Sequence, residues 1–365
     1  MPRSAQRSGT PQDAPTQIAL LLQGGGALAS FQCGAYQTLH AAGIEPAWAV
    51  GISSGALNAT LIAGNPPERR VERLRAFWET ISQPALPYPP ALRAWSTFVR
   101  GRAGFFRPKP VPTFMQRYWG SEFESWYDVS PLRGTLERFV DFDRINDTRS
   151  MRLSLGVVEV QSGQCVYFDN RRERLTPEHV LASCALPPGF APIEIDGRHY
   201  WDAGLVSNTP LECLLLDPPA VRTLAIAVDL WQAPGIVPVD STAVTSVMQD
   251  LEYMGRTQAV RAALDAARRA EASLAALLAT VPVECRATSA YDEALATLQT
   301  PSLSVLDVIY HDKPCQDYYK TFDFSLPQIE AHWKNGKRAM RAALARDGGM
   351  LGLMSSEQPA QAAAA

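Results

Sequence analysis

The chain has 365 residues, and 34 lysine and arginine residues against 37 aspartate and glutamate residues leave a formal net charge of only −3. A chain with so small a net charge lacks the positive electrostatic field of proteins that coat DNA or RNA. We therefore expect no nucleic-acid partner. Apolar residues make up 46% of the chain and charged residues 19%, a composition that can bury a large core and excludes a disordered protein. The sequence predicts a globular protein.

The cysteines and the ends of the chain bear on its location. The six cysteines contain no C-x-x-C pair, and we interpret them as reduced thiols of a cytoplasmic protein. Residues 1–16 lack the apolar block of a secretory signal, and no stretch has the roughly eighteen unbroken apolar residues of a spanning helix. Because residues 1–16 and 347–365 show no periodicity of a buried face, we expect two disordered tails.

A buried strand begins the folded part of the chain. The apolar run at residues 18–22 stops at three glycines, 24–26, which predicts a strand that enters a tight turn. A helix follows and ends near Gly43, and a second apolar run at residues 48–52 leads into another helix over residues 56–63. This order predicts a mostly parallel sheet with helices on both faces.

Residues 88–127 differ in composition from the rest of the chain. They hold about a third of the aromatic residues, five prolines, and six lysine and arginine residues against two acidic ones. Two interpretations stay open. The segment is either a proline-broken surface insertion with its own small core, or a cap that faces lipid, because aromatic and arginine side chains together suit a membrane interface.

The second half of the chain continues this α/β pattern. Residues 153–160 and 165–168 are typical of a strand pair, and residues 223–230 of a buried strand. The pattern is helical from residue 245 to 279, and a further helix over residues 325–345 begins with a serine N-cap and ends with lysine and arginine.

The turn from Gly24 to Ala29 fits two kinds of ligand site. It matches G-x-G-x-x-[GA] between a predicted strand and a predicted helix, as in dinucleotide-binding proteins, and Glu45 lies about 20 residues further on. Adjacent glycines at a helix N-terminus bring backbone N–H groups close to an anionic oxygen. That oxygen belongs either to a pyrophosphate or to a tetrahedral intermediate, and a tight turn without a ligand is the third interpretation.

A second turn favours ester chemistry. Residues 51–55 fit G-x-S-x-G between a predicted strand and a predicted helix, which is the setting of a nucleophile elbow. Gly51 and Gly55 leave room for a sharp reversal that pushes Ser53 outward, and we expect Ser54 at the start of the helix. An ordinary helix cap is the alternative. Both turns follow neighbouring strands at the edge where open α/β sheets bind their ligands.

A serine hydroxyl needs a base within hydrogen-bond reach before it acts as a nucleophile. His311 and His332 fall late in the chain, as the Ser…Asp…His order of α/β-hydrolases requires, but neither follows a clear strand-end loop that holds the acid. Asp202 is the other candidate, because a carboxylate at a strand end can approach a neighbouring turn, and Trp201 beside it can exclude water. An aspartate that only forms a turn is the alternative.

Taken together, these residues resemble the patatin-like phospholipases. The resemblance rests on four blocks in order: the glycine turn, G-x-S-x-G about 27 residues later, Ala182 to Pro187, and Asp202 to Gly204. It covers residues 17 to about 230, and residues 304–345 are similar to an extension of some bacterial members. The resemblance implies a three-layer α/β/α sandwich with a mostly parallel sheet, and a lipid acyl hydrolase without a metal or another cofactor.

The resemblance also assigns roles to individual residues. It makes Ser53 the nucleophile and Asp202 the general base of a Ser-Asp dyad, with Gly51 and Gly55 as the elbow glycines. The small residues after the aspartate are Ala203 and Gly204. Gly24, Gly25, Gly26 and Ala27 form the oxyanion hole. Its hydrogen-bond donors are the backbone N–H groups of Gly25, Gly26 and Ala27.

The chain departs from the family pattern at three positions. Leu28 and Ala29 stand where the family has arginine or lysine and then glycine, and the lost charge bears on the strength of the oxyanion hole. Ala203 stands where the family has a first glycine, a replacement that is tolerated unless this residue needs a positive φ.

We therefore expect a serine hydrolase whose substrate is a lipid ester, a phospholipid or lysophospholipid, with a peripheral membrane contact through residues 88–127. The rival hypotheses are a nucleotide-dependent oxidoreductase that uses the glycine turn and a lipid-binding protein that has the fold without the catalysis. We expect a disordered tail at residues 1–16, a patatin-like catalytic domain at 17–240 and an insertion or cap within it at 88–127. A helical C-terminal extension follows at 241–346, and a second disordered tail at 347–365.

Overall fold

The computed structural model places most of the chain between the expected tails. The described residues are 17–84, 89–111, 113–120, 124–232, 237–239, 241–298, 303–311 and 318–347. The expected tails are residues 1–16 and 347–365; apart from Asp347, the last residue of α12, they lie outside the described residues, as do residues 85–88, where the expected insertion begins.

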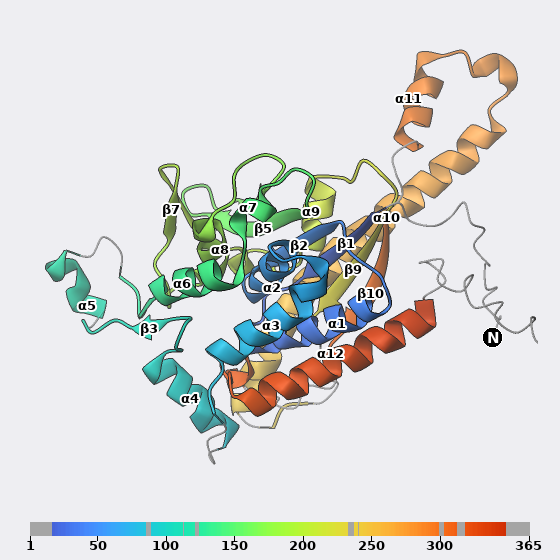
Figure 1. Cartoon of the computed structure of the whole chain (residues 1–365). Coiled ribbons are helices and arrows are strands. Elements are labelled where there is room, and N and C mark those ends of the chain that lie inside the picture. The colour runs from blue at the N-terminus through green and yellow to red at the C-terminus, as the bar shows by residue number, and fades with distance from the viewer. Residues whose placement is uncertain are drawn as a thin grey trace, which may run out of the picture.

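An eight-stranded sheet forms the centre of the molecule (Figure 1). Its strands follow the order β10-β9-β1-β2-β5-β8-β7, and β6 pairs with β5. The pairings from β10 to β5 are parallel, whereas β6, β7 and β8 pair in antiparallel fashion. The expected strands are present to within one residue at each end. The bounds are β1 Gln17–Leu22, β2 Trp48–Ile52, β5 Arg152–Glu159, β6 Cys165–Asp169, β7 Ile193–Ile195, β8 Arg198–Asp202, β9 Thr223–Asp229 and β10 Leu303–Ile309.

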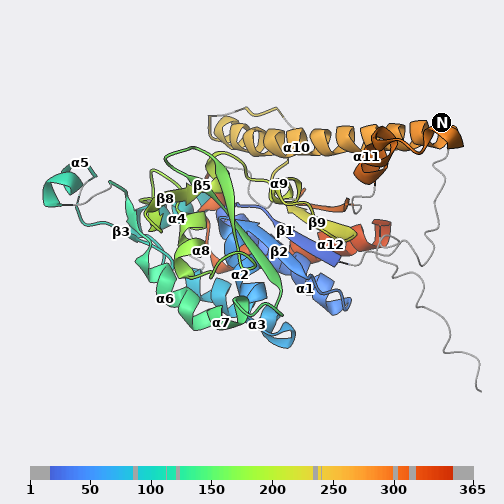
Figure 2. The same cartoon turned by 90° about the horizontal axis from the view of Figure 1, so that it is seen from above.

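Helices cover both faces of the sheet, as Figure 2 shows. In β1, Leu20 and Leu22 belong to one buried cluster, and Ala19 and Leu21 to the other. Because successive strand residues point to opposite faces, an apolar strand of this kind requires a cover on each side. On the first face lie α1 Ser30–Ala41, α2 Ser54–Ala63, α3 Pro67–Ile81, α6 Ser130–Phe139, α8 Pro177–Cys184 and α12 Leu326–Asp347; on the second lie α9 Leu211–Leu216 and α10 Ser241–Thr280. The chain is thus the expected α/β/α sandwich.

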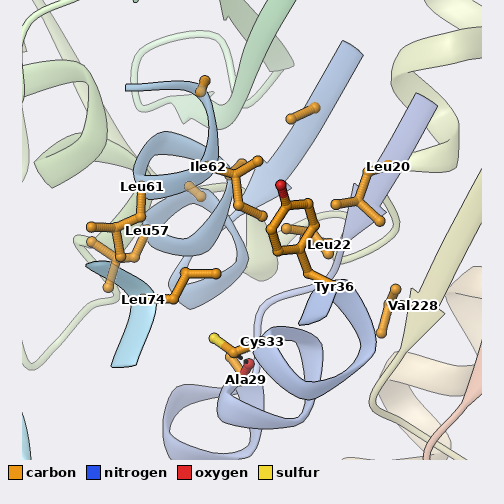
Figure 3. Close-up of a cluster of buried hydrophobic side chains, with 14 of the residues drawn as sticks. Leu20, Leu22, Ala29, Cys33, Tyr36, Leu57, Leu61, Ile62, Leu74 and Val228 are labelled. Carbon is orange, nitrogen blue, oxygen red and sulfur yellow. Dashed lines mark hydrogen bonds between the residues drawn. The ribbon is translucent and has the colours of Figure 1, made fainter. Parts of the chain in front are cut away.

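The larger cluster joins the first strand to three helices. Figure 3 shows Leu22 of β1, Tyr36 of α1, Leu57 of α2 and Leu74 of α3 gathered in one region, and each is at most 1% exposed. Burying one side chain of this size contributes about 1.5–3 kcal/mol. The cluster therefore fixes the helices that follow the two candidate turns.

The aromatic residues of the expected insertion pack on one another and on Phe190, Phe322 and Phe324 from outside it. Tyr127 and Phe106 are buried with ring centroids 4.8 Å apart, and Phe98 lies 5.9 Å from Tyr127. Figure 1 shows α5 and β3 away from the central sheet. The elements of this segment are α4 Pro90–Arg100, β3 Arg107–Pro108, α5 Thr113–Gln116, η3 Arg117–Trp119 and β4 Tyr127–Asp128.

The C-terminal part contributes a strand as well as helices. β10 extends the central sheet by pairing in parallel with β9, which the expectation of a purely helical extension misses. The distal half of α10 and α11 extend away from the sheet in Figure 1. No helix in the described part of the chain is both long and apolar enough to cross a bilayer. The remaining short elements are η2 Gly26–Ala29, α7 Phe142–Ile145, η4 Ala203–Leu205, η5 Val283–Cys285, α11 Ser289–Leu298 and η6 Tyr318–Thr321.

Helix α12 packs on α1 with almost no space between the two backbones. A Cβ atom at Gly34 would lie 1.9 Å from the Trp333 carbonyl oxygen, and one at Gly336 would lie 1.9 Å from the Phe31 carbonyl oxygen. Two glycines therefore permit this crossing, and α12 is part of the layer that covers the sheet.

We expect Gly336→Ala to lower the free energy of unfolding by about 1–3 kcal/mol, because the added methyl group forces the two helices apart. Thermal and urea unfolding measure this change. The matched control is Gly134→Ala in α6, where an added Cβ has no neighbour within 4 Å. That substitution removes a flexible residue from a helix and should stabilise the protein by up to about 1 kcal/mol. Equal effects of the two substitutions would contradict the close helix packing.

Candidate active site

The candidate nucleophile and base lie where two strands end against β5. Strand β2 runs parallel to β5, and its last pair joins Ile52 to Gly156. Strand β8 runs antiparallel to β5, and its pairing joins Asp202, the last residue of β8, to Val157. Because Gly156 and Val157 are consecutive, the two strands end at nearly the same level on opposite sides of β5, and Ser53 follows directly after Ile52.

Ser53 occupies the sharp turn that the sequence predicts. Its φ of 56° and ψ of −127° lie in a region that residues with a side chain rarely adopt. A Cβ atom at Gly55 would lie 2.1 Å from the Leu22 carbonyl oxygen, and one at Gly51 would lie 2.5 Å from the Gly55 carbonyl oxygen. Both positions therefore require glycine, as in a nucleophile elbow.

Asp202 is buried beside Ser53. The residue is 1% exposed, and its carboxyl group accepts a hydrogen bond from the Gly204 N–H at 2.8 Å. Burial raises the pKa of Asp202 to about 7, although the Ser53 side chain and the Gly204 N–H act in the opposite direction. A carboxylate with this pKa is a much stronger base than an exposed aspartate.

The end of α8 fastens both strand ends. Ser183 Oγ accepts a hydrogen bond from the Ser53 N–H at 3.0 Å and donates one to the Gly156 carbonyl at 2.7 Å. The Asp202 N–H donates to the Ala185 carbonyl at 3.1 Å. The third sequence block thus has a structural role, since it holds the elbow and the aspartate at a fixed separation.

The glycine turn lies directly beside the elbow. A Cβ atom at Gly24 would lie 2.8 Å from Ser53 Cβ. Asn208 accepts a hydrogen bond from the Gly24 N–H and donates one to the Gly24 carbonyl, both at 2.9 Å, and Trp231 Nε1 donates to the same carbonyl at 2.8 Å. Asn208 and Trp231 are absent from the sequence-based site, because these contacts join positions 184 and 207 residues apart.

Some backbone N–H groups of the glycine turn donate hydrogen bonds within the protein and others do not. The Gly25 N–H donates to Ser54 Oγ at 3.0 Å, so Ser54 faces the glycine turn from the start of α2, where the sequence places it. Within the described chain, the N–H groups of Gly26 and Ala27 have no acceptor. Such free donors at a helix start attract an anionic oxygen.

Family models match most of the chain. A model described as patatin-like phospholipase matches residues 20–215, and one described as patatin phospholipase matches residues 251–349. The chain belongs to the patatin-like phospholipase family. It is therefore a lipid hydrolase, and its substrates are lipids. No curated protein matches the chain.

Two solved structures resemble this patatin-like phospholipase distantly. The crystal structure of VipD from Legionella pneumophila is 15% identical, with a TM-score of 0.41, over 91% of this chain and 67% of VipD. Human GIVD cytosolic phospholipase A2, in complex with methyl gamma-linolenyl fluorophosphonate inhibitor and terbium chloride, is 11% identical with a TM-score of 0.37. That match covers 94% of this chain and 61% of the human enzyme.

The departures of this patatin-like phospholipase from the family pattern have local explanations. Leu28 is fully buried in the main hydrophobic cluster, a place that a basic side chain could not share. Among the described residues, positive φ outside glycine occurs at Ser53 and Asp196, so Ala203 does not need the conformational freedom of glycine.

Residues considered for other mechanisms have other partners. His332 Nδ1 lies 2.5 Å from Tyr310 Oη, and His311 is exposed after β10. Glu45, the acidic residue of the dinucleotide-binding interpretation, is bound by Arg70 Nη1 at 2.5 Å and by His40. No group of three or more potential ligands among the described histidine, cysteine, aspartate and glutamate residues could hold a metal ion.

We expect Asp202→Asn to stabilise the protein more at pH 8 than at pH 5. The folded state holds the Asp202 proton more tightly than the unfolded chain, whose carboxyl has a pKa near 3.8. The contribution of the protonated Asp202 to the free energy of unfolding is therefore complete below pH 3.8. It is lost as the pH rises through about 7, at about 1.4 kcal/mol per pH unit. Thermal melts of both proteins at the two pH values measure the difference.

The control for this measurement is Asp143→Asn, because the Asp143 side chain is 87% exposed. Its effect on the melting temperature should be small at both pH values. An equal gain from Asp202→Asn at pH 5 and pH 8 would show that the Asp202 pKa is not raised.

Proposed function

We propose that this enzyme cleaves carboxylic esters of phospholipids or lysophospholipids with Ser53 as nucleophile and Asp202 as general base. The observation that carries the proposal is the position of a buried carboxyl group, with a pKa of about 7, next to the Ser53 side chain. A base with a pKa near the working pH is both ionised and strong enough to accept a proton.

The reaction follows the usual order of acyl transfer by a serine. Asp202 removes the proton of Ser53 Oγ as this oxygen attacks the ester carbonyl carbon. The resulting tetrahedral intermediate releases the alcohol, which takes the proton from Asp202, and leaves an acyl group on Ser53. Water then attacks this acyl-enzyme with Asp202 again as the base, which frees the fatty acid. No further acid or base is required.

The free N–H groups of Gly26 and Ala27 suit the oxyanion of the tetrahedral intermediate. Gly25 also belongs to the expected oxyanion hole, but its N–H is bonded to Ser54. Gly24 is likewise bonded, to Asn208. The proposal therefore assigns the oxyanion to Gly26 and Ala27, since donors that point at developing charge without reorganisation stabilise the transition state most.

We expect Ser53→Ala to reduce hydrolysis of a short soluble ester at least about 10³-fold and to abolish covalent labelling by a fluorophosphonate. The matched variant is Ser54→Ala, which loses the bond to Gly25 but keeps the reacting oxygen. It should still be labelled, at a reduced rate. In-gel labelling of the three proteins gives the result directly.

Labelling and a thermal-shift titration with NAD and NADP together separate the rival hypotheses. Labelling of Ser53→Ala would place the nucleophile elsewhere. A wild-type protein that binds phospholipid but is neither labelled nor active would instead be the lipid-binding protein. A nucleotide-dependent enzyme would show a higher melting temperature with NAD or NADP, because a ligand that binds only the folded state stabilises it.

We also propose that the insertion contacts the lipid surface through α4. Leu92, Trp95 and Val99 recur at helical spacing and are 52–53% exposed, and Trp119 of η3 is 65% exposed. Helix α4 contacts η6, which contacts η2 of the glycine turn, so the side chains of α4 belong to the same end of the molecule as the glycine turn. An amphipathic helix of this kind inserts its apolar face at the boundary of acyl chains and head groups.

The arginines of the insertion contribute less than the sequence suggests. Arg107 Nη2 is paired with Asp128 Oδ2 at 2.8 Å, and Arg102 is half-buried with its Nε bonded to the Gly101 carbonyl. Arg100 remains exposed. The apolar side chains of α4 therefore carry the proposal of membrane contact.

We expect the double variant Leu92→Ser/Val99→Ser to hydrolyse phospholipid vesicles about tenfold more slowly, because two apolar side chains no longer enter the lipid. Hydrolysis of a short soluble ester should be unchanged. The control variant Leu277→Ser/Val283→Ser removes exposed apolar side chains, 66% and 74% exposed, from the distant end of α10 and η5. If the two variants hydrolyse phospholipid vesicles at equal rates, α4 does not contact the lipid surface and has only a structural role.

A further inference from the structure

A buried ion pair joins two segments of the C-terminal part. The Lys320 side chain of η6 is 0% exposed and that of Asp250 in α10 is 1% exposed, and Nζ lies 2.6 Å from Asp250 Oδ2. Lys320 Nζ also donates to Ser246 Oγ at 2.9 Å. The desolvation of two buried charges consumes much or all of their attraction, so stability alone does not explain such a pair.

On one side, the pair is adjacent to the turn that holds the free N–H groups. Thr321 follows Lys320, and its carbonyl oxygen fills the place of a side chain at Gly26, where a Cβ atom would lie only 2.3 Å away. Gly26 has a φ of +58°, a conformation that favours glycine. The position of η6 therefore limits where the backbone at Gly26 can lie.

On the other side, α10 holds the start of the turn. Gln23 is 1% exposed, and its Nε2 donates to Thr257 Oγ1 of α10 at 3.0 Å. The ring of Trp231, which bonds to Gly24, lies 4.6 Å from the ring of Tyr253 in α10 and 5.5 Å from Lys320 Nζ. The glycine turn is thus enclosed between α10 and η6, the two segments that the ion pair connects.

We propose that Lys320 and Asp250 are positioning residues that hold the N–H groups of Gly26 and Ala27 in place for the oxyanion. This inference rests on the proposed function, and it concerns the turn rather than the dyad. Lys320 acts by holding η6 against α10, since Asp250 neutralises its charge. The glycine turn has Leu28 where the family has a basic residue. Contacts with the C-terminal part would order this turn instead.

The decisive variant is Lys320→Met/Asp250→Leu, which removes both charges and keeps apolar volume, so that neither charge is left buried alone. We expect kcat on a short soluble ester to fall at least about tenfold, with KM within about threefold, because small displacements of catalytic groups cost rate rather than binding. Fluorophosphonate labelling should slow by a similar factor. The pH at which turnover is half-maximal should stay unchanged, because Asp202 is untouched.

A readout independent of activity is amide hydrogen exchange in the peptide that covers residues 23–28. It should become faster in the double variant, while exchange in the elbow peptide over residues 51–57 stays the same. Arg70→Met is the control, because it also removes a cation whose side chain is only 5% exposed and that binds Glu45, at the far end of α1. It should lower the melting temperature without changing kcat or exchange in the glycine turn.

The possible results separate this inference from the proposed function. Faster exchange together with a lower kcat supports it. Unchanged exchange and kcat in a folded double variant would overturn it, as would faster exchange with unchanged kcat, since the turn would then move without effect on the reaction. Failure of wild-type labelling would contradict the proposed function. The exchange comparison would still decide whether the ion pair orders the turn.

Discussion

The site depends on a single feature of strand register. Strands β2 and β8 approach β5 from opposite directions and end at consecutive residues, Gly156 and Val157. A shift of one residue in either pairing would move Ser53 or Asp202 along the strand by about 3.3 Å and turn it to the other face. The hydrogen bonds of Ser183 and Ala185 oppose such a shift, because they connect both strand ends to the end of α8.

The two family matches, at residues 20–215 and 251–349, do not correspond to two independent bodies in the structure. Strand β10 belongs to the same sheet as β1, helix α12 packs on α1, and η6 lies against Gly26. Helix α12 and η6 contact elements that begin or follow the glycine turn, and β10 extends the sheet beyond β9. The C-terminal part thus contributes to the central sheet and to its helical cover.

Short-range sequence patterns predict the sharp turn at Ser53 and the strand that precedes the glycine turn. The glycines around Ser53 and the run of apolar residues in β1 are adjacent in the chain, so short-range spacing is enough to place them. Asn208 and Thr321 contact glycines that lie about 180 and about 295 positions earlier in the chain, and no local pattern indicates these contacts. Strand β10 is also missed, although five of its seven residues are apolar; it lies at the edge of the sheet, and within it only Leu306 and Val308 are buried.

The contact of α12 with α1 has a consequence for the order of events during biosynthesis. The Thr38 hydroxyl donates to the Lys337 carbonyl 299 residues later, and both helices belong to the layer that supports the glycine turn. Contacts between such distant positions form late, because the chain between them must first be closed into a loop. A nascent chain on the ribosome thus contains α1 long before α12, the helix that packs on it, has been translated. The helical layer on this face of the sheet is therefore complete only near the end of synthesis.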